Sequence, residues 1–226
     1  MKKRKITALL LCAAVIFTLT ACAGQEESGP SVSLEDTEDT AGMPAGGDNI
    51  LIAYFSVPET DGTDTVAGAS RVSVDGQVMG NNEYVAHLIQ QQTGGDLFAI
   101  ETEQEYPGTH DELLDFAYNE MTEEARPALA SQIENLDSYD TIFLGYPNWN
   151  ADLPMPLYTF LEEYNLSGKT IIPFTTHGGS GFSGTIETIG QMQPDAAVIE
   201  DGLSISRNAV PDAAGEVADW VDGLEL

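Results

Sequence analysis

Ile50-Leu-Ile-Ala-Tyr-Phe55 and Thr141-Ile-Phe-Leu-Gly-Tyr146 are the two stretches that decide the fold of this chain. Both are continuously apolar instead of alternating between apolar and polar residues. That pattern is typical of strands covered on both faces, as in parallel sheets flanked by helices. We therefore expect both stretches to lie inside a parallel sheet.

The rest of the region from Ile50 to Leu226 alternates between further short apolar runs and longer stretches with helical periodicity. This repeated pattern predicts an α/β fold with a doubly wound parallel sheet and helices on both faces. The expected strands cover residues 50–56, 96–101, 141–146, 170–175 and 196–199, the last with an extension over 203–206. The expected helices cover residues 82–93, 110–122 with a continuation over 127–135, 155–164, 185–191 and 212–224.

Residues 57–79 interrupt this rhythm, because they follow the first strand without an obvious helix. Within them, Arg71-Val-Ser-Val-Asp-Gly-Gln-Val78 is typical of a small hairpin that turns at Asp-Gly. We expect an insertion between the first strand and its helix. A loop of this length is usually functional or mobile.

The N-terminus has the layout of a secretory signal peptide. Basic residues at positions 2–5 precede an apolar run over residues 6–19, which is short for a membrane span of about 20 residues. Leu19-Thr-Ala-Cys22 resembles the cleavage site of bacterial lipoproteins, in which the cysteine carries the lipid. An uncleaved anchor helix and a plain signal peptide with a chance cysteine are the alternatives. We expect a signal peptide over residues 1–21 and lipidation at Cys22, with the protein held on the outer face of the cell membrane.

Residues 22–49 nearly lack large apolar side chains and are rich in Gly, Ser, Pro, Thr, Asp and Glu. Such a segment cannot bury a core, so we expect a disordered acidic tether. The 177 residues from 50 to 226 are enough for one folded domain. The cysteines, Cys12 and Cys22, both precede this domain, which therefore has no thiol for a disulfide, a metal site or a nucleophile.

The chain is strongly acidic, with a formal net charge of −29. Half of its eight basic residues belong to the expected signal peptide, so the processed chain keeps four against 37 acidic residues, a formal charge of −33. This charge disfavours nucleic acid and anionic lipid headgroups as partners. It is also compatible with solubility in a salty exterior.

Ligands of open parallel sheets bind at the carboxyl ends of the strands, so the residues that follow each strand are candidates for a site. Ser56 follows the first strand, and Gly80-Asn81-Asn82 begins the next helix after the insertion. Hydroxyl and amide side chains at a helix N-terminus can bind a phosphate without a cation. An asparagine at this position is also a common simple helix cap.

Two further loops follow the third and fourth strands. Pro147-Asn148-Trp149-Asn150 places a tryptophan between two amides, which suits stacking on a flat aromatic ligand better than burial in a core. The alternative is a surface tryptophan that packs on its own loop. Thr176-His177-Gly178-Gly179-Ser180-Gly181 is a glycine-rich loop that lets the backbone approach a ligand closely. Ser180 does not fit a hydrolase nucleophile, because Phe182 stands where that motif needs its last glycine.

Together these segments resemble the flavodoxin family. The resemblance rests on Ile52-Ala-Tyr-Phe-Ser56, Leu144-Gly-Tyr-Pro-Asn-Trp149 and Pro173-Phe-Thr-Thr-His-Gly-Gly-Ser-Gly181. It implies a five-stranded sheet in the order 2-1-3-4-5 and a non-covalently bound FMN. It also implies that Ser56, Asn81 and Asn82 hold the phosphate, that Pro147 to Asn150 line one side of the flavin ring, and that Thr176 to Gly181 line the other. The insertion departs from the family pattern, because it splits the phosphate loop.

The expected function is electron transfer by a low-potential flavoprotein whose redox partner is a protein or a membrane quinol. The first alternative is an FMN-dependent quinone or small-molecule oxidoreductase with His177 or Tyr146 as proton donor. The second alternative is a non-redox binding lipoprotein with this fold. His87 and His110 fall on expected helix surfaces, and we assign them no role.

Overall fold

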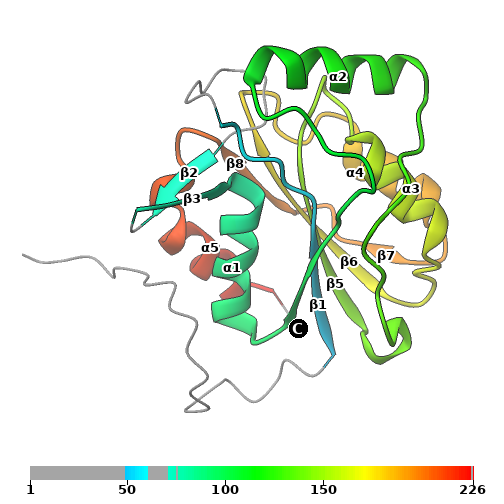
Figure 1. The fold of residues 1–226 in the computed structure, drawn as a ribbon. Helices are drawn as coiled ribbons and strands as arrows, with labels where there is room; N and C mark the ends of the chain where they lie inside the picture. Colours follow the sequence, from blue (N-terminus) through cyan, green and yellow to red (C-terminus); the bar gives the residue numbers. More distant parts are fainter. Residues whose placement is uncertain (1–48, 61–70, 75, 225) are drawn as a thin grey trace, which may run out of the picture. The chain divides into compact units, whose positions relative to one another are not determined.

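The computed structural model describes residues 49–60, 71–74, 76–224 and 226. Its central sheet is parallel and has the strand order β4-β1-β5-β6-β7, with β8 also paired to β6 (Figure 1). This arrangement confirms the expected doubly wound sheet and its order 2-1-3-4-5. The strands are β1 Ile50–Tyr54, β4 Asp96–Ala99, β5 Thr141–Pro147, β6 Thr170–His177, β7 Ala197–Val198 and β8 Leu203–Ser206.

Helices cover both faces of this sheet. α1 packs against α5 on one face, whereas α3 contacts both α2 and α4 on the other (Figure 1). The helices are α1 Asn81–Thr93, α2 His110–Thr122, α3 Met155–Glu163, α4 Thr185–Met192 and α5 Ala214–Asp222, with 3₁₀ turns η1 Leu136–Ser138 and η2 Val210–Asp212. In the described part of the chain, no helix is both long and apolar enough to span a membrane.

The apolar strands form the centre of the core, as their sequence predicts. Ile142, Phe143 and Leu144 of β5 have no exposed surface. Gly145 follows them because a Cβ at this position would lie 2.0 Å from Cζ of Phe174 on the neighbouring strand β6. The close approach of two central strands therefore depends on the absence of a side chain at residue 145.

The insertion contains the expected hairpin, formed by β2 Arg71–Val74 and β3 Gln77–Gly80 in antiparallel pairing. Gly76 in its turn has φ +81°, a conformation that favours glycine. The hairpin returns the chain to the end of β1, because a Cβ on Gly80 would lie 1.9 Å from Oγ of Ser56. Residues that 23 intervening positions separate in the sequence are therefore neighbours in space.

The expected helical continuation over residues 127–135 is wrong. α2 ends at Thr122, and Glu124 then adopts φ +50°, which no helix can accommodate. Beyond Pro127 the backbone pairs with the loop after β4: Glu103 N donates to Ala128 O at 2.9 Å, and Ala130 N donates to Glu101 O at 2.8 Å. The apolar residues of this segment thus complete their hydrogen bonds with another loop instead of within a helix.

The expected signal peptide, the lipidation site at Cys22 and the acidic tether lie outside the described residues, so they stay predictions.

Candidate functional site

The structure brings the candidate phosphate-binding residues together at the carboxyl end of β1. Ser56 lies beside Gly80, which directly precedes Asn81 and Asn82 at the start of α1. Asn82 in turn reaches the fourth expected strand, because its Nδ2 donates to Thr176 Oγ1 of β6 at 2.9 Å. The predicted first and third loops of the site are therefore in direct contact.

Asn148 joins the second loop to the third. Its backbone N donates to Thr176 O at 3.0 Å, and its Nδ2 donates to Gly181 O at 2.6 Å and to Ser183 Oγ at 3.1 Å. All three segments that the sequence analysis singled out thus converge on one end of the sheet.

The buried amide side chains at this end have unused hydrogen-bonding capacity. We call Asn81, Asn82 and Asn148 the amide edge; their exposed fractions are 2%, 1% and 6%. Both polar atoms of Asn81, and Oδ1 of both Asn82 and Asn148, have no hydrogen-bond partner among the described residues. Buried polar atoms in folded proteins are normally hydrogen-bonded, so each such atom requires an explanation. A polar ligand that completes these bonds provides one.

The start of α1 has the features of an anion site, but a carboxylate already uses one of its N–H groups. The positive end of the helix dipole and the first backbone N–H groups favour an anion there. In the structure, however, Gly80 N donates to Glu83 Oε2 at 3.0 Å. The Glu83 carboxylate therefore caps an N–H group that a phosphate at this position would use.

The glycine-rich loop after β6 is shaped by residues in left-handed conformations. Gly179, Gly181 and Ser183 have φ values of +139°, +58° and +52°. His177 Nδ1 accepts a hydrogen bond from Gly179 N at 2.9 Å, which leaves the proton of the neutral ring on Nε2. Burial lowers the pKa of His177 below 6.5, so the ring is neutral at pH 7. Ser180 is exposed in this loop.

A family model for flavodoxins matches residues 70–224. This chain belongs to the flavodoxin family. Among solved structures it is similar to a protein of Bacteroides eggerthii DSM 20697 assigned as a flavoprotein, with 27% identity over 79% of this chain and 98% of that chain and a TM-score of 0.58. A flavoprotein of Lactobacillus acidophilus NCFM in complex with FMN has a similar fold, with 17% identity over 74% of this chain and 98% of that chain and a TM-score of 0.52. No match is found among curated proteins.

Trp149 is buried in this flavodoxin-family chain, which its sequence context does not suggest. The side chain is only 4% exposed, so the expectation that it avoids the core is wrong. Its ring centroid lies 5.5 Å from that of Phe55 and 5.8 Å from that of Tyr106. A contact between Trp149 and a flavin ring stays a prediction, whereas its contacts with Phe55 and Tyr106 explain its burial.

A tight turn follows Trp149. Asn150 and Ala151 have φ values of +53° and +64°, and Trp149 and Asp152 exchange both backbone hydrogen bonds across them, at 2.9 and 3.2 Å. Two consecutive residues with positive φ are typical of a type I′ turn, in which the second position favours glycine. Ala151 therefore carries backbone strain directly beside the candidate site. Asn150 and Ala151 are both exposed.

Tyr146 lies in the core of the flavodoxin-family domain and not at its candidate site. It has no exposed surface, and its hydroxyl forms a 2.8 Å hydrogen bond with Thr185 Oγ1 at the start of α4. Burial raises the pKa of Tyr146 above its usual value. This placement does not fit a proton donor beside a flavin ring. Pro147, the next residue, is also buried.

Two buried polar pairs escaped the sequence analysis. His110, expected on a helix surface, is 5% exposed, and its Nδ1 contacts Glu59 Oε1, whose side chain is completely buried. Glu120 of α2 is 7% exposed and accepts hydrogen bonds from Tyr106 Oη at 2.7 Å and from Gln104 Nε2. No local motif marks either pair, because the partners are 14 to 51 positions apart in the sequence.

Proposed function

We propose that the chain binds FMN non-covalently at the amide edge and serves as an electron-transfer protein. The observation that carries the proposal is the set of buried, unpartnered atoms on Asn81, Asn82 and Asn148, which belong to two of the three candidate segments, and Asn82 and Asn148 both donate hydrogen bonds to the third. Membership of the flavodoxin family and the fold shared with an FMN complex support it.

The residues at the site fit the chemical groups of FMN. Ser56 and the helix start at Asn81 and Asn82 suit the phosphate, because hydroxyl and N–H groups there compensate for a missing cation. Asn148 and the glycine-rich loop suit the polar edge of the ring, where side-chain and backbone amides can reach it. When bound, FMN supplies the reversible electron-transfer chemistry, and the surrounding residues tune its potential.

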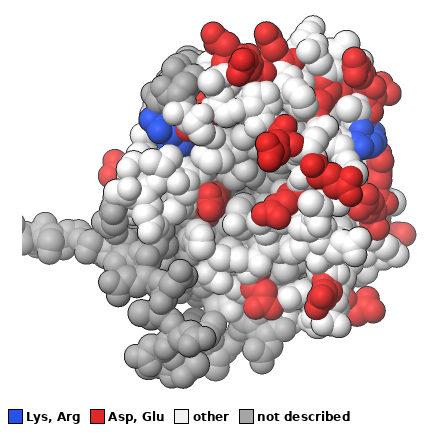
Figure 2. Space-filling view, viewed as in Figure 1, with Lys and Arg blue, Asp and Glu red and all other residues white. Residues whose placement is uncertain are grey.

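The charge of the chain favours a low potential. Figure 2 shows acidic side chains across the viewed face and basic side chains only near its margins. Any negative charge added at the site on reduction is repelled by this surface, although solvent screens the distant carboxylates. We therefore expect a midpoint potential below that of free FMN.

An absorbance spectrum tests cofactor binding. Purified full-length protein, incubated with FMN and desalted, should retain the flavin bands, and Asn82→Ala should weaken binding about 10- to 100-fold, since loss of a buried hydrogen bond costs about 1–3 kcal/mol. Asn208→Ala, at an exposed position, is the matched control. Absence of flavin bands after incubation would end the FMN proposal and leave a non-redox binding protein.

The location of this activity is the second part of the proposal. A lipid on Cys22 would tether the protein to the outer face of the membrane, where membrane quinols or another surface redox protein are the accessible partners. Cys22→Ala should move the protein from the membrane fraction to the soluble fraction of its host. Retention of the variant in the membrane would contradict the lipid anchor.

One observation favours an FMN-dependent oxidoreductase as the second candidate. The hydrogen bond from Gly179 N to His177 Nδ1 places the N–H of the neutral ring on Nε2, which can donate a hydrogen bond to charge that develops on a substrate oxygen. If the protein is an enzyme, His177→Ala should reduce quinone turnover about 10²- to 10³-fold while the flavin spectrum remains. A wild-type protein that exchanges electrons with proteins but does not turn over quinone is a carrier.

A further inference from the structure

A cavity of about 420 Å³ lies beside the candidate FMN site, between the loops that follow β1 and β4. Its wall is formed by residues 55–58 and by six residues between positions 100 and 106. Of the residues expected to contact FMN, only Ser56 belongs to this wall. Its volume lies in the range of small-molecule sites, about 300–1,000 Å³.

Hydrogen bonds hold both walls of this cavity in place. Thr60 N donates to Gly108 O at 2.7 Å, which ties the loop after β1 to the loop after β4. Glu101 N donates to Ser131 Oγ at 2.9 Å, and the hydroxyl of Tyr106 donates to Glu120. The cavity is therefore formed before any ligand enters.

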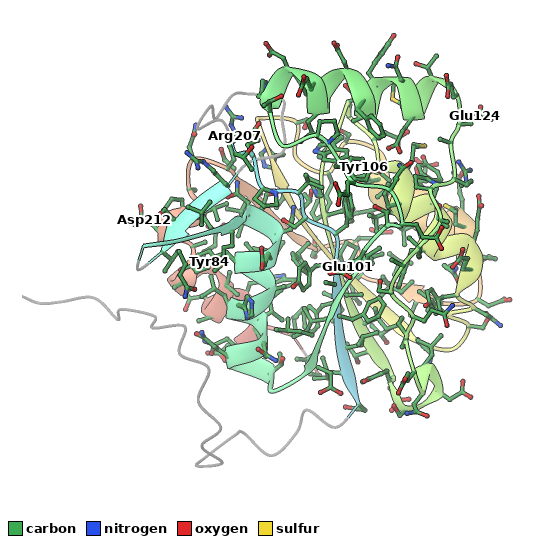
Figure 3. The ribbon with its side chains drawn as sticks, in the orientation of Figure 1. Tyr84, Glu101, Tyr106, Glu124, Arg207 and Asp212 are labelled. Carbon is green, nitrogen blue, oxygen red and sulfur yellow. The ribbon has the colours of Figure 1, made fainter. Side chains whose placement is uncertain are left out.

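Aromatic and aliphatic side chains give the cavity an apolar lining. Phe55 and Tyr106 meet edge to face, with ring centroids 5.5 Å apart, and Val57, Pro58 and Ile100 complete this part of the wall. Glu101 and Tyr106 both come from the segment that joins β4 to α2 (Figure 3). An apolar wall with a few polar groups is the usual composition of a site for a small organic molecule.

The described charged groups that line the cavity are acidic. Glu101 and Glu105 line it and are exposed, and among the described residues no lysine or arginine does so. Of the basic side chains in the described part of the chain, Arg126 pairs with Glu162, and Lys169 donates to the carbonyl oxygen of Tyr139. Burial first, and then the charges of Glu83 and Glu101, raise the pKa of Tyr54 at the end of β1 to about 12. The negative field thus reaches the end of the sheet.

We propose that this cavity binds a small organic cation with an apolar or aromatic body, such as a protonated arylalkyl amine. The rings and aliphatic side chains take the apolar body, whereas Glu101 and Glu105 take the positive charge. Phe55 and Tyr106 also contact Trp149 of the predicted flavin loop, so the bound amine lies next to the candidate FMN site. The proposal requires only the cavity and does not depend on bound FMN.

Three probes of the same size test the choice of ligand. Benzylamine, benzyl alcohol and benzoate share one ring and differ in charge, and each is titrated into the full-length Trp220→Phe variant, in which Trp149 is the sole tryptophan fluorophore. We expect benzylamine to bind about tenfold more tightly than benzyl alcohol, because an ion pair near the surface adds about this much. Benzoate should not bind. Equal affinity for the three probes, or preference for benzoate, would overturn the proposal.

Matched variants test whether benzylamine binds in this cavity. Glu101→Gln with Glu105→Gln should remove the preference for benzylamine over benzyl alcohol. The control replaces Glu187 and Glu200, which line another cavity near α4 and β7 without any aromatic residue, by glutamine. This control should leave benzylamine binding unchanged. Loss of binding in the control, or full binding in the first variant, would refute the assignment.

A parallel titration separates this proposal from FMN binding. Flavin absorbance is recorded for the same samples, with and without added FMN, and Asn82→Ala serves as a variant impaired in FMN binding. Benzylamine should bind to this variant as it does to the parent protein. Loss of amine binding in Asn82→Ala would show that the two sites are one and would contradict a separate cation site.

Discussion

The amide edge and the cluster of Phe55, Tyr106 and Glu120 lie at the same end of the sheet, yet they treat buried polar groups in opposite ways. Tyr106 has its hydroxyl bound by Glu120, and both carboxylate oxygens of Glu120 are used. Asn81, only 2% exposed, leaves both ends of its amide without a partner among the described residues. The buried polar groups of the cluster are therefore paired within the protein, whereas the amide edge keeps buried polar atoms open for a ligand.

The largest expected effect tests the stabilising role of the cluster. Phe55 is 3% exposed and contacts both Tyr106 and Trp149, so Phe55→Ala should lower the free energy of unfolding by about 3–5 kcal/mol. Urea denaturation measures this loss. Tyr118→Ala, at an exposed position of α2, is the control and should change stability by less than about 0.5 kcal/mol. Equal stability of the two variants would remove the contrast between cluster and edge.

The next effect tests the edge itself. Asn81→Leu keeps the side-chain size but removes two unpaired polar atoms, so the protein without cofactor should become more stable by about 1–3 kcal/mol. FMN binding, measured by fluorescence quenching, should weaken in the same variant. A variant that is less stable and still binds FMN normally would mean that Asn81 has a structural role.

A smaller effect concerns the strained turn beside the edge. Ala151 has φ +64°, so Ala151→Gly should relieve strain and raise the free energy of unfolding by about 1 kcal/mol. Asn150→Gly should gain less, because asparagine tolerates a left-handed conformation. Thermal and urea unfolding of both variants check the order. Loss of stability in Ala151→Gly would show that the backbone at residue 151 is not strained.

The smallest effect is a pH dependence within the cluster. Burial raises the pKa of Glu120 above 4.5, although the hydrogen bonds from Tyr106 and Gln104 oppose this shift. A raised pKa in the folded state means that the contribution of Glu120 to stability is complete below the pKa of the unfolded chain and is lost as pH rises through the folded pKa.

Glu120→Gln should remove this contribution. The variant should therefore gain stability relative to the parent protein as pH rises from 4 to 7, measured by urea denaturation at each pH. If the free energies of unfolding of the variant and the parent protein differ by the same amount at every pH from 4 to 7, the pKa of Glu120 is not raised.

Most of the fold could be predicted from local patterns. The apolar runs at residues 50–55 and 141–146 supply β1, which ends at Tyr54, and β5, and Leu203–Ser206 forms β8 with the expected bounds. Where prediction failed, a distant partner decided the outcome. Residues 127–135 have apolar side chains at helix-compatible spacing, but their backbone pairs with Glu101 and Glu103 of another loop.

The candidate site, like the fold, could be predicted from local sequence only in part. Sequence order placed polar residues after three strands, and a parallel sheet brings those strand ends together. It could not show that the hairpin would return Gly80 to Ser56 or that Trp149 would turn into the core. Both outcomes depend on packing between segments that are far apart in the chain.

By itself, the sequence determined the alternation of strands and helices, the acidic charge and the three loops of the candidate site, because periodicity, composition and short motifs act over a few residues. Only the tertiary structure decided which polar groups are satisfied. Asn82 finds Thr176 across 94 positions, His110 finds Glu59 across 51, and Asn81 finds no partner within the described residues. The physical reason is that the cost of a buried polar group depends on the neighbours that the fold provides.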